Sequence, residues 1–293
     1  MSVQTAEQDL QEVLRRPISK LIKLLLSPPF LVIYAWVLLS LFAGHLGLQA
    51  PNQINANLSL MPPGPGHWLG TDELGRDELS RILYGAKDAL VIGLGSVLIG
   101  AGTGTVLGLI SGYGSKSTDW LLMRIADTLL ALPAIVIAMV VITILGNGVP
   151  DLILAIAMGE VPVYLRLVRG STLGLRHKEF VEASVAMGAG RLRTIFRHIL
   201  PNIIGPALVM GTIDMGYAIL SVAGLTFIGL GPPPPRPEWG SMITSAQQYI
   251  PAHWWIAVDP GVAIVIAVLA LNLAGERLQR YLDPQAQRVR PHL

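Results

Sequence analysis

The chain has 293 residues, of which 52% are hydrophobic and only 14% are charged, and its formal net charge is +2. Soluble domains carry about 25% charged residues, and the apolar residues here occur in long runs, so the composition excludes an ordinary soluble protein. It predicts an all-α protein that crosses a membrane several times. The sequence contains no cysteine, which excludes disulfide bonds and thiolate metal sites.

Residues 1–28 precede the first long apolar run and have the pattern of a cytoplasmic amphipathic helix. Apolar residues from Leu10 to Leu25 fall on one stripe, and basic residues such as Arg15 and Lys20 fall on the other face. Such a helix lies along the headgroup layer rather than crossing the membrane, although a solvated surface helix has the same pattern. Charges throughout the segment and the lack of a small-residue cleavage site argue against a cleavable signal peptide.

Six apolar segments are long enough to cross a membrane as helices. They define a transmembrane domain over residues 29–285, which a short basic tail follows at 286–293. A polar loop over residues 49–87 separates the first two segments, and Pro133 and Pro162 are expected to kink the third and fourth. The predicted spans are 30–48, 89–112, 120–145, 152–168, 203–230 and 254–273.

The second span carries a small residue at every fourth position, which places these residues on one face of a helix. A stripe of this kind lets two helix backbones approach closely in lipid. We therefore expect this helix to pack against a neighbour instead of facing lipid. The stripe consists of Ser96, Gly100, Gly104, Gly108 and Gly112.

Residues 171–201 form a long polar insert between the fourth and fifth spans, which we call the elbow. Residues 178–187 are mostly helix formers, and Gly188 and Gly190 then supply a break. A second helical pattern follows and stops at Pro201. This arrangement predicts a helical segment that a soluble partner protein contacts and moves.

Lysine and arginine residues are unevenly divided between the two sides of the predicted membrane domain. Seventeen of the 21 lie in the N-terminal segment, near the loop after the second span, in and beside the elbow, or in the tail. Basic loops stay in the cytoplasm, so this bias predicts that the elbow and both termini are cytoplasmic. The same bias explains why the elbow is basic, so nucleic-acid binding is not needed to explain it.

The sequence lacks the patterns of common catalytic and nucleotide sites. The turn around Lys116 lacks the glycines of a phosphate loop, because Ser115 and Ile110 occupy their positions. The six histidines never pair at i, i+4 and lack clustered carboxylates, which argues against a metal site, and no nucleophile elbow is present. We therefore expect this chain not to be an enzyme.

The elbow resembles the EAA loop of ABC importer permeases. It contains Glu182-Ala183-Ser184, then Gly188 after three residues, and finally Leu200-Pro201 at the spacing of that motif. Ser184 replaces the second alanine of the motif, and His198 stands where the general pattern has isoleucine. Both residues fit a helix, and the glycine and proline are in place.

Four further stretches are similar to C-type permeases of the dipeptide, oligopeptide and nickel ABC importer family. The resemblance covers roughly residues 30–285 and implies the type I permease fold. Glu276 stands where the family usually has aspartate, and the proline run at 232–235 is longer than expected. The stretches are residues 67–85, 225–231, 237–240 and 272–284.

The resemblance implies one subunit of a larger machine in the inner membrane of a bacterium or archaeon. Such permeases pair as a heterodimer with a B-type permease and sit on two cytoplasmic ATPases. They receive cargo from an extracytoplasmic binding protein. ATP and Mg²⁺ belong to the ATPases, so no cofactor is expected in this chain.

The resemblance also implies where the partners bind. The binding protein is expected to sit on residues 67–85 and 232–253, although residues 71–73 equally have the composition of a helix start. Its expected contacts are Thr71, Asp72, Arg76, Asp77, Glu238 and Trp239. The residues expected to dock into an ATPase are Lys178, Glu179, Glu182, Ala183, Ser184, Ala186, Gly188, Gly190, Leu200 and Pro201.

Glu160 and Asp214 are acidic residues inside predicted spans. A carboxylate there costs about 2.5 kcal/mol or more by insertion scales, so both side chains are expected to face protein or water. Either they line the translocation pathway and meet the ammonium group of a peptide, or they pair with a neighbouring span or the partner permease.

Peptides are the expected cargo, with nickel or metal chelates as the second choice within the family. A stand-alone secondary transporter is the rival from another class. It would account for the spans and the buried acids but not for the elbow motif, and it would move solute without ATPase partners.

Overall fold

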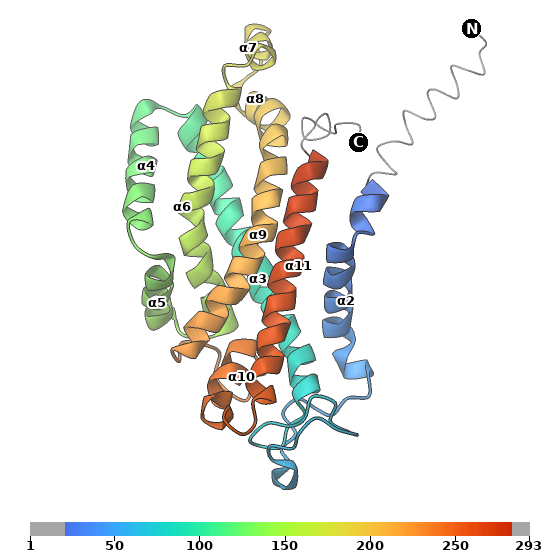
Figure 1. The fold of residues 1–293 in the computed structure, drawn as a ribbon. Helices are drawn as coiled ribbons and strands as arrows, with labels where there is room; N and C mark the ends of the chain where they lie inside the picture. The colour runs from blue at the N-terminus through green and yellow to red at the C-terminus, as the bar shows by residue number, and fades with distance from the viewer. Residues whose placement is uncertain (1–20, 283–293) are drawn as a thin grey trace, which may run out of the picture.

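The computed structural model describes residues 21–282, and the regular elements within that range are all helices (Figure 1). The long helices lie side by side, and we name the two ends of the bundle the α7 end and the α10 end. Residues 1–20 of the predicted amphipathic segment and the predicted tail, 286–293, lie outside the described residues. The elements are α2 (Pro28–Phe42), α3 (Glu78–Tyr113), α4 (Lys116–Leu130), α5 (Ala134–Leu145), α6 (Val149–Leu175), α7 (Glu179–Ala186), α8 (Arg191–Thr194), α9 (Leu200–Phe227), α10 (Trp239–Ala246) and α11 (Trp255–Leu282), with a π-helical segment at Ile195–Ile199 and short 3-10 turns at Ala43–His45, Ala56–Leu58 and Gln247–Tyr249.

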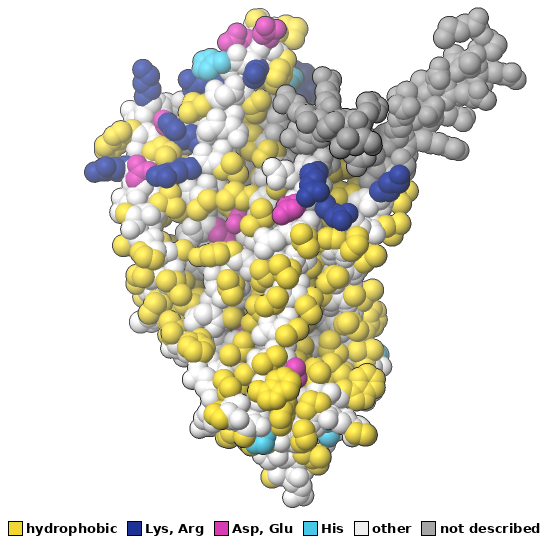
Figure 2. Space-filling model, viewed as in Figure 1, with side chains coloured by type: hydrophobic (Ala, Val, Ile, Leu, Met, Phe, Trp, Pro, Cys, Tyr) yellow, Lys and Arg dark blue, Asp and Glu magenta, His cyan; other side chains and the backbone are white. Residues whose placement is uncertain are grey.

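Four helical stretches within residues 21–282 are long and apolar enough to cross a membrane, and the α4–α5 pair would supply a fifth. The four are Pro28–His45, Glu78–Tyr113, Arg191–Phe227 and Trp255–Leu282. The predicted fourth span lies in α6, which is long enough at 27 residues but carries Glu160, Arg166 and Arg169. Figure 2 shows hydrophobic side chains over the middle of the molecule, with lysine and arginine gathered toward the α7 end. The chain is therefore a polytopic helical membrane protein.

The predicted third span is two helices instead of one. α4 and α5 meet at an angle of 92°, and Pro133 is the N-cap residue of α5. Proline has no amide hydrogen to continue the helix and disfavours helical backbone in the residue before it. The expected kink at Pro133 is consequently a complete break, and the expectation of one kinked helix over residues 120–145 is corrected to two separate helices.

Several helices extend beyond the apolar runs from which the spans were predicted. α3 begins at Glu78, inside the expected polar loop 49–87, because the Asp77 side chain caps it by accepting a 2.8 Å hydrogen bond from the Ser80 amide. At the α7 end, α6 continues to Leu175 and α11 to Leu282. In α3 and α11 polar helix formers sustain the backbone hydrogen bonds past the apolar region, which hydropathy alone does not detect.

The small-residue stripe of α3 packs against α6, as the sequence predicts. A Cβ atom on Gly104 would lie 2.5 Å from the Cβ of Tyr164, and one on Gly108 would lie 2.7 Å from the Cβ of Val168. Because both sets repeat every four residues, the two backbones stay close over several turns. The stripe also places Gly100 against Glu160 and Gly112 against Thr172.

Candidate functional site

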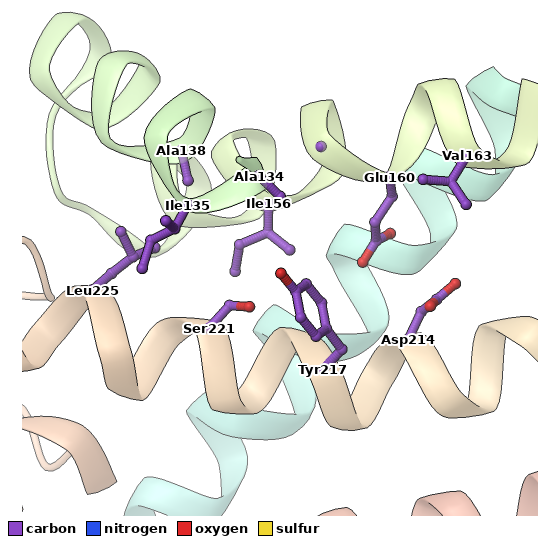
Figure 3. A pocket seen from close by; sticks show the side chains of 11 residues that line it. Ala134, Ile135, Ala138, Ile156, Glu160, Val163, Asp214, Tyr217, Ser221 and Leu225 are labelled. Atoms are coloured by element: carbon purple, nitrogen blue, oxygen red, sulfur yellow. The ribbon is translucent and has the colours of Figure 1, made fainter. Parts of the chain in front are cut away.

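A cavity of about 180 Å³ lies among α5, α6 and α9 (Figure 3). Apolar side chains of α5 form one wall, and Glu160 of α6 and Asp214 of α9 extend into the opposite part. The hydroxyl groups of Tyr217 and Ser221 lie along α9 between these two regions. The cavity thus joins an acidic region to an apolar one.

Glu160 is the most unusual side chain of the cavity. It is only 6% exposed, and neither of its carboxylate oxygens has a hydrogen-bond partner among the described residues. Its position depends on α3, because a Cβ atom on Gly100 would come within 2.7 Å of Glu160 Oε2. A buried polar group without a partner is costly, and such groups mark functional positions in membrane proteins.

Asp214 differs from Glu160 because it has a partner inside the chain. The Tyr164 hydroxyl donates a 2.6 Å hydrogen bond to Asp214 Oδ2, and Tyr164 itself is completely buried. Asp214 therefore lines the cavity and also pairs with a neighbouring helix. Pairing with a neighbouring span, one of the two possibilities that the sequence leaves open, is therefore present at Asp214, and a role in the translocation pathway stays a prediction.

The elbow projects from the bundle as α7 and α8, with Gly188 between them (Figure 1). Gly188 has a φ of +87°, a left-handed conformation that favours glycine, and this turn reverses the chain. Most of the predicted docking residues are exposed, and Met187 and Leu192 expose 83% and 72% of their surface. The elbow presents both acidic and apolar groups to the surroundings.

Ser184 is the exception among the predicted docking residues, because it is buried inside the elbow. Its hydroxyl lies 3.1 Å from His198 Nε2 in the π-helical segment, and the His198 ring packs beside Phe180. Ser184 and His198 are the two residues that depart from the general elbow motif. The structure thus brings the two departures into contact with each other, which their separation in sequence did not reveal.

At the α10 end, the six side chains predicted to contact a binding protein are buried within this chain. Thr71 Oγ1 accepts a 2.9 Å hydrogen bond from the Met61 amide, and Asp72 binds Arg76 at 2.6 Å and lies 3.4 Å from Arg81. These groups hold the loop in place instead of forming its surface. The alternative prediction of a helix start at residues 71–73 is wrong, because the N-cap of α3 is Asp77.

Glu238 and Trp239 attach α10 to the rest of the bundle. The Glu238 carboxylate accepts hydrogen bonds of 2.8 and 2.7 Å from the amides of Gly240 and Ser241, and its burial raises the pKa of Glu238 above its usual value despite these bonds. The Trp239 indole donates a 2.9 Å hydrogen bond to the Ile82 carbonyl and stacks on Trp36. Both residues therefore have structural roles within this chain.

Trp68 is a largely exposed residue of the 67–85 stretch that is not among the six predicted contacts. It is 76% exposed and lies beside His67, whose ring nitrogen contacts Asp77 at 2.9 Å. Exposed tryptophans are enriched at protein interfaces. The sequence feature that could have indicated this residue is a tryptophan inside an otherwise polar loop.

The chain matches the family model described as a binding-protein-dependent transport system inner membrane component over residues 104–288. The di/tripeptide transport system permease protein DppC of Pseudomonas aeruginosa is 42% identical to it over 85% of this chain and 84% of the relative. The dipeptide transport system permease protein DppC of Alkalihalophilus pseudofirmus is 40% identical over 87% and 84%, respectively. The glutathione transport system permease protein GsiD of Pectobacterium atrosepticum is 42% identical over 76% and 74%.

A solved structure of an amino acid ABC transporter with histidines covers 70% of this chain and 95% of its own, with a TM-score of 0.54. The identity of 14% makes this a likeness of fold alone. The family match extends over more than half of the chain, and the relatives align with most of it. The chain belongs to the family of binding-protein-dependent transport system inner membrane components, the permeases of bacterial ABC importers.

Proposed function

We propose that this chain forms half of the translocation pathway of an ATP-driven importer for di- and oligopeptides. The observation that carries the proposal is the 42% identity with a di/tripeptide permease over 85% of the chain. The cavity supports it, because an acidic and an apolar region side by side suit a peptide amino terminus. The chain itself catalyses no reaction in this proposal.

The remaining parts of the importer would be a B-type permease, two ATPases and an extracytoplasmic binding protein. The α7 end would be cytoplasmic together with both termini, because lysine and arginine gather there (Figure 2). ATP and Mg²⁺ would be bound by the ATPases.

The ATPase would grip the exposed face of the elbow, including Glu179, Glu182 and Ala186 on α7. Closure of the two ATPases would then pull the elbow and tilt α6 and α9, which flank it, to open the pathway to the other side. Ser184 would act by supporting α7 from within, since its side chain is buried.

The binding protein would sit on the loops of the α10 end. The six buried side chains would hold these loops in their conformation, and exposed residues such as Trp68 would contact the binding protein. This assignment keeps the predicted surface but separates the residues that touch the partner from those that hold the loop.

Reconstitution tests the proposal. The four kinds of subunit are purified together and placed in proteoliposomes, and uptake of radiolabelled alanyl-alanine is followed with and without ATP. Uptake that requires both ATP and the binding protein is expected. Uptake of a nickel chelate in place of the peptide would support the second cargo, and solute movement by this chain alone would indicate a secondary transporter.

A further inference from the structure

We propose that Glu160 binds the protonated amino group of the cargo inside the cavity, and that the α5 wall receives the small apolar side chain next to it. This inference rests on the proposed function and adds which residue recognises which part of the cargo. It separates Glu160, which binds, from Asp214, which positions the helices around it.

The burial and hydrogen bonding of the two carboxylates distinguish their roles. Glu160 is 94% buried, faces the cavity and has no hydrogen-bond partner among the described residues. Asp214, in contrast, accepts a hydrogen bond from the Tyr164 hydroxyl. A carboxylate with both oxygens unsatisfied is a receptor for a group with several N–H donors, and an ammonium group has three. Tyr164 already occupies Oδ2 of Asp214, so Glu160 is the better receptor.

The charge of the lining residues and the volume of the cavity suit such a ligand. Its acidic side chains are Glu160 and Asp214, and no lysine or arginine is among the described residues that line it. Pockets for drug-sized molecules measure roughly 300–1,000 Å³. A cavity of about 180 Å³ is smaller than these and suits a small group such as an amino-terminal residue.

The remaining lining residues complete the match to an amino-terminal residue. Ala134, Ile135 and Ala138 of α5 offer a shallow apolar surface opposite the carboxylates (Figure 3). Ser221 and Tyr217 place hydroxyl groups between the two regions, where a peptide carbonyl or amide would lie. The amino group, the small apolar side chain and the peptide group of an amino-terminal residue would thus face the carboxylates, the α5 surface and the hydroxyl groups, respectively.

The packing of α3 provides a way to move Glu160 without changing its charge. A Cβ atom on Gly100 would meet Glu160 Oε2 at 2.7 Å, Glu160 Cβ at 2.8 Å and the Ala157 carbonyl at 3.1 Å, so Gly100→Ala must displace Glu160 together with the part of α6 that carries it. A Cβ atom on Gly102 would meet nothing within 4 Å. Gly102→Ala is therefore a matched control on the same helix.

The first experiment measures binding to the assembled permease–ATPase complex without the binding protein. Thermal unfolding is followed with alanyl-alanine and with N-acetyl-alanyl-alanine at tens of millimolar. We expect alanyl-alanine alone to raise the unfolding temperature of the wild type and of Gly102→Ala, because ligands stabilise the state that they bind. Glu160→Gln and Gly100→Ala should lose this rise. No rise in the wild type, or an equal rise in Glu160→Gln, overturns the inference.

The second experiment measures ATP-driven uptake of alanyl-alanine in proteoliposomes with the binding protein present. We expect Glu160→Gln to reduce kcat/KM at least tenfold, Glu160→Asp to recover part of the loss, and Gly102→Ala to match the wild type. Glu160→Asp also serves if Glu160→Gln does not assemble. Absence of uptake by the wild-type complex would overturn the proposed function itself, whereas normal uptake by Glu160→Gln would overturn only the role of Glu160.

Discussion

Tyr164 of α6 and Asp214 of α9 are joined by a 2.6 Å hydrogen bond, although 50 residues separate them in sequence. α6 precedes the elbow and α9 follows it, so the bond connects the two helices that carry the elbow. It also orients one carboxylate of the cavity. The same pair therefore links the two helices that flank the elbow to the cavity.

Replacement of Tyr164 by phenylalanine should leave Asp214 without this donor while preserving the ring. We expect the free energy of unfolding to fall by about 1–3 kcal/mol, the usual cost of an unsatisfied buried polar group. Thermal unfolding of the detergent-solubilised complex measures it. Tyr217→Phe is the control for stability, because the structure shows no hydrogen bond from that hydroxyl; equal stability of the two variants would contradict the prediction.

Substitution of Gly104 by alanine should force α3 and α6 apart. The added methyl group would lie 2.5 Å from the Cβ of Tyr164, and overpacking of this kind costs about 1–3 kcal/mol. Gly102→Ala removes the same glycine flexibility but meets open space, so it should be neutral or slightly stabilising. The unfolding temperatures of the two variants should therefore differ in favour of Gly102→Ala.

Substitution of Gly188 by valine should distort the elbow, because a β-branched residue rarely adopts a φ of +87°. We expect the complex to hydrolyse ATP while its uptake of alanyl-alanine falls, since the elbow would no longer transmit the movement. Gly174→Ala is the matched control, because Gly174 lies in α6 outside the left-handed region and a Cβ atom there meets nothing within 4 Å. Normal uptake by Gly188→Val would refute the coupling role of the turn.

The contact between Ser184 and His198 should make the two side chains energetically dependent on each other. A double-mutant cycle with Ser184→Ala and His198→Ile isolates this dependence. We expect a coupling energy of about 0.5–1.5 kcal/mol in the stability of the complex, as for one hydrogen bond. Strictly additive effects would mean that the 3.1 Å contact does not stabilise the elbow.

Replacement of Trp68 by alanine should weaken the interaction with the binding protein. Loss of an interfacial tryptophan costs about 2 kcal/mol or more, which corresponds to at least a roughly thirtyfold weaker affinity. Surface plasmon resonance on the immobilised complex measures the affinity directly. Trp120 is also largely exposed, at 68%, but it lies on α4, away from the α10 loops. Trp120→Ala should leave the affinity unchanged, and an equal loss in both variants would argue against the α10 end as the seat.

Local patterns in the chain are sufficient for its class and for several of its elements. Apolar runs predict the helices, four-residue spacing predicts that the stripe from Ser96 to Gly112 packs on a neighbour, and Gly188 predicts the break in the elbow. These inferences succeed because hydropathy, helical periodicity and glycine backbone freedom act over one or a few turns. The same locality explains why the family is recognisable from short motifs.

Side-chain partners and exposure depend instead on contacts between distant segments. Thr71, Asp72 and Glu238 look like surface residues in sequence, yet the fold buries them in a hydrogen-bonded framework. Glu160 and Asp214 look alike in sequence, and only the approach of Tyr164 to one of them makes them different. Burial and pairing of this kind arise when helices pack together, because no short stretch of chain contains both members of such a contact.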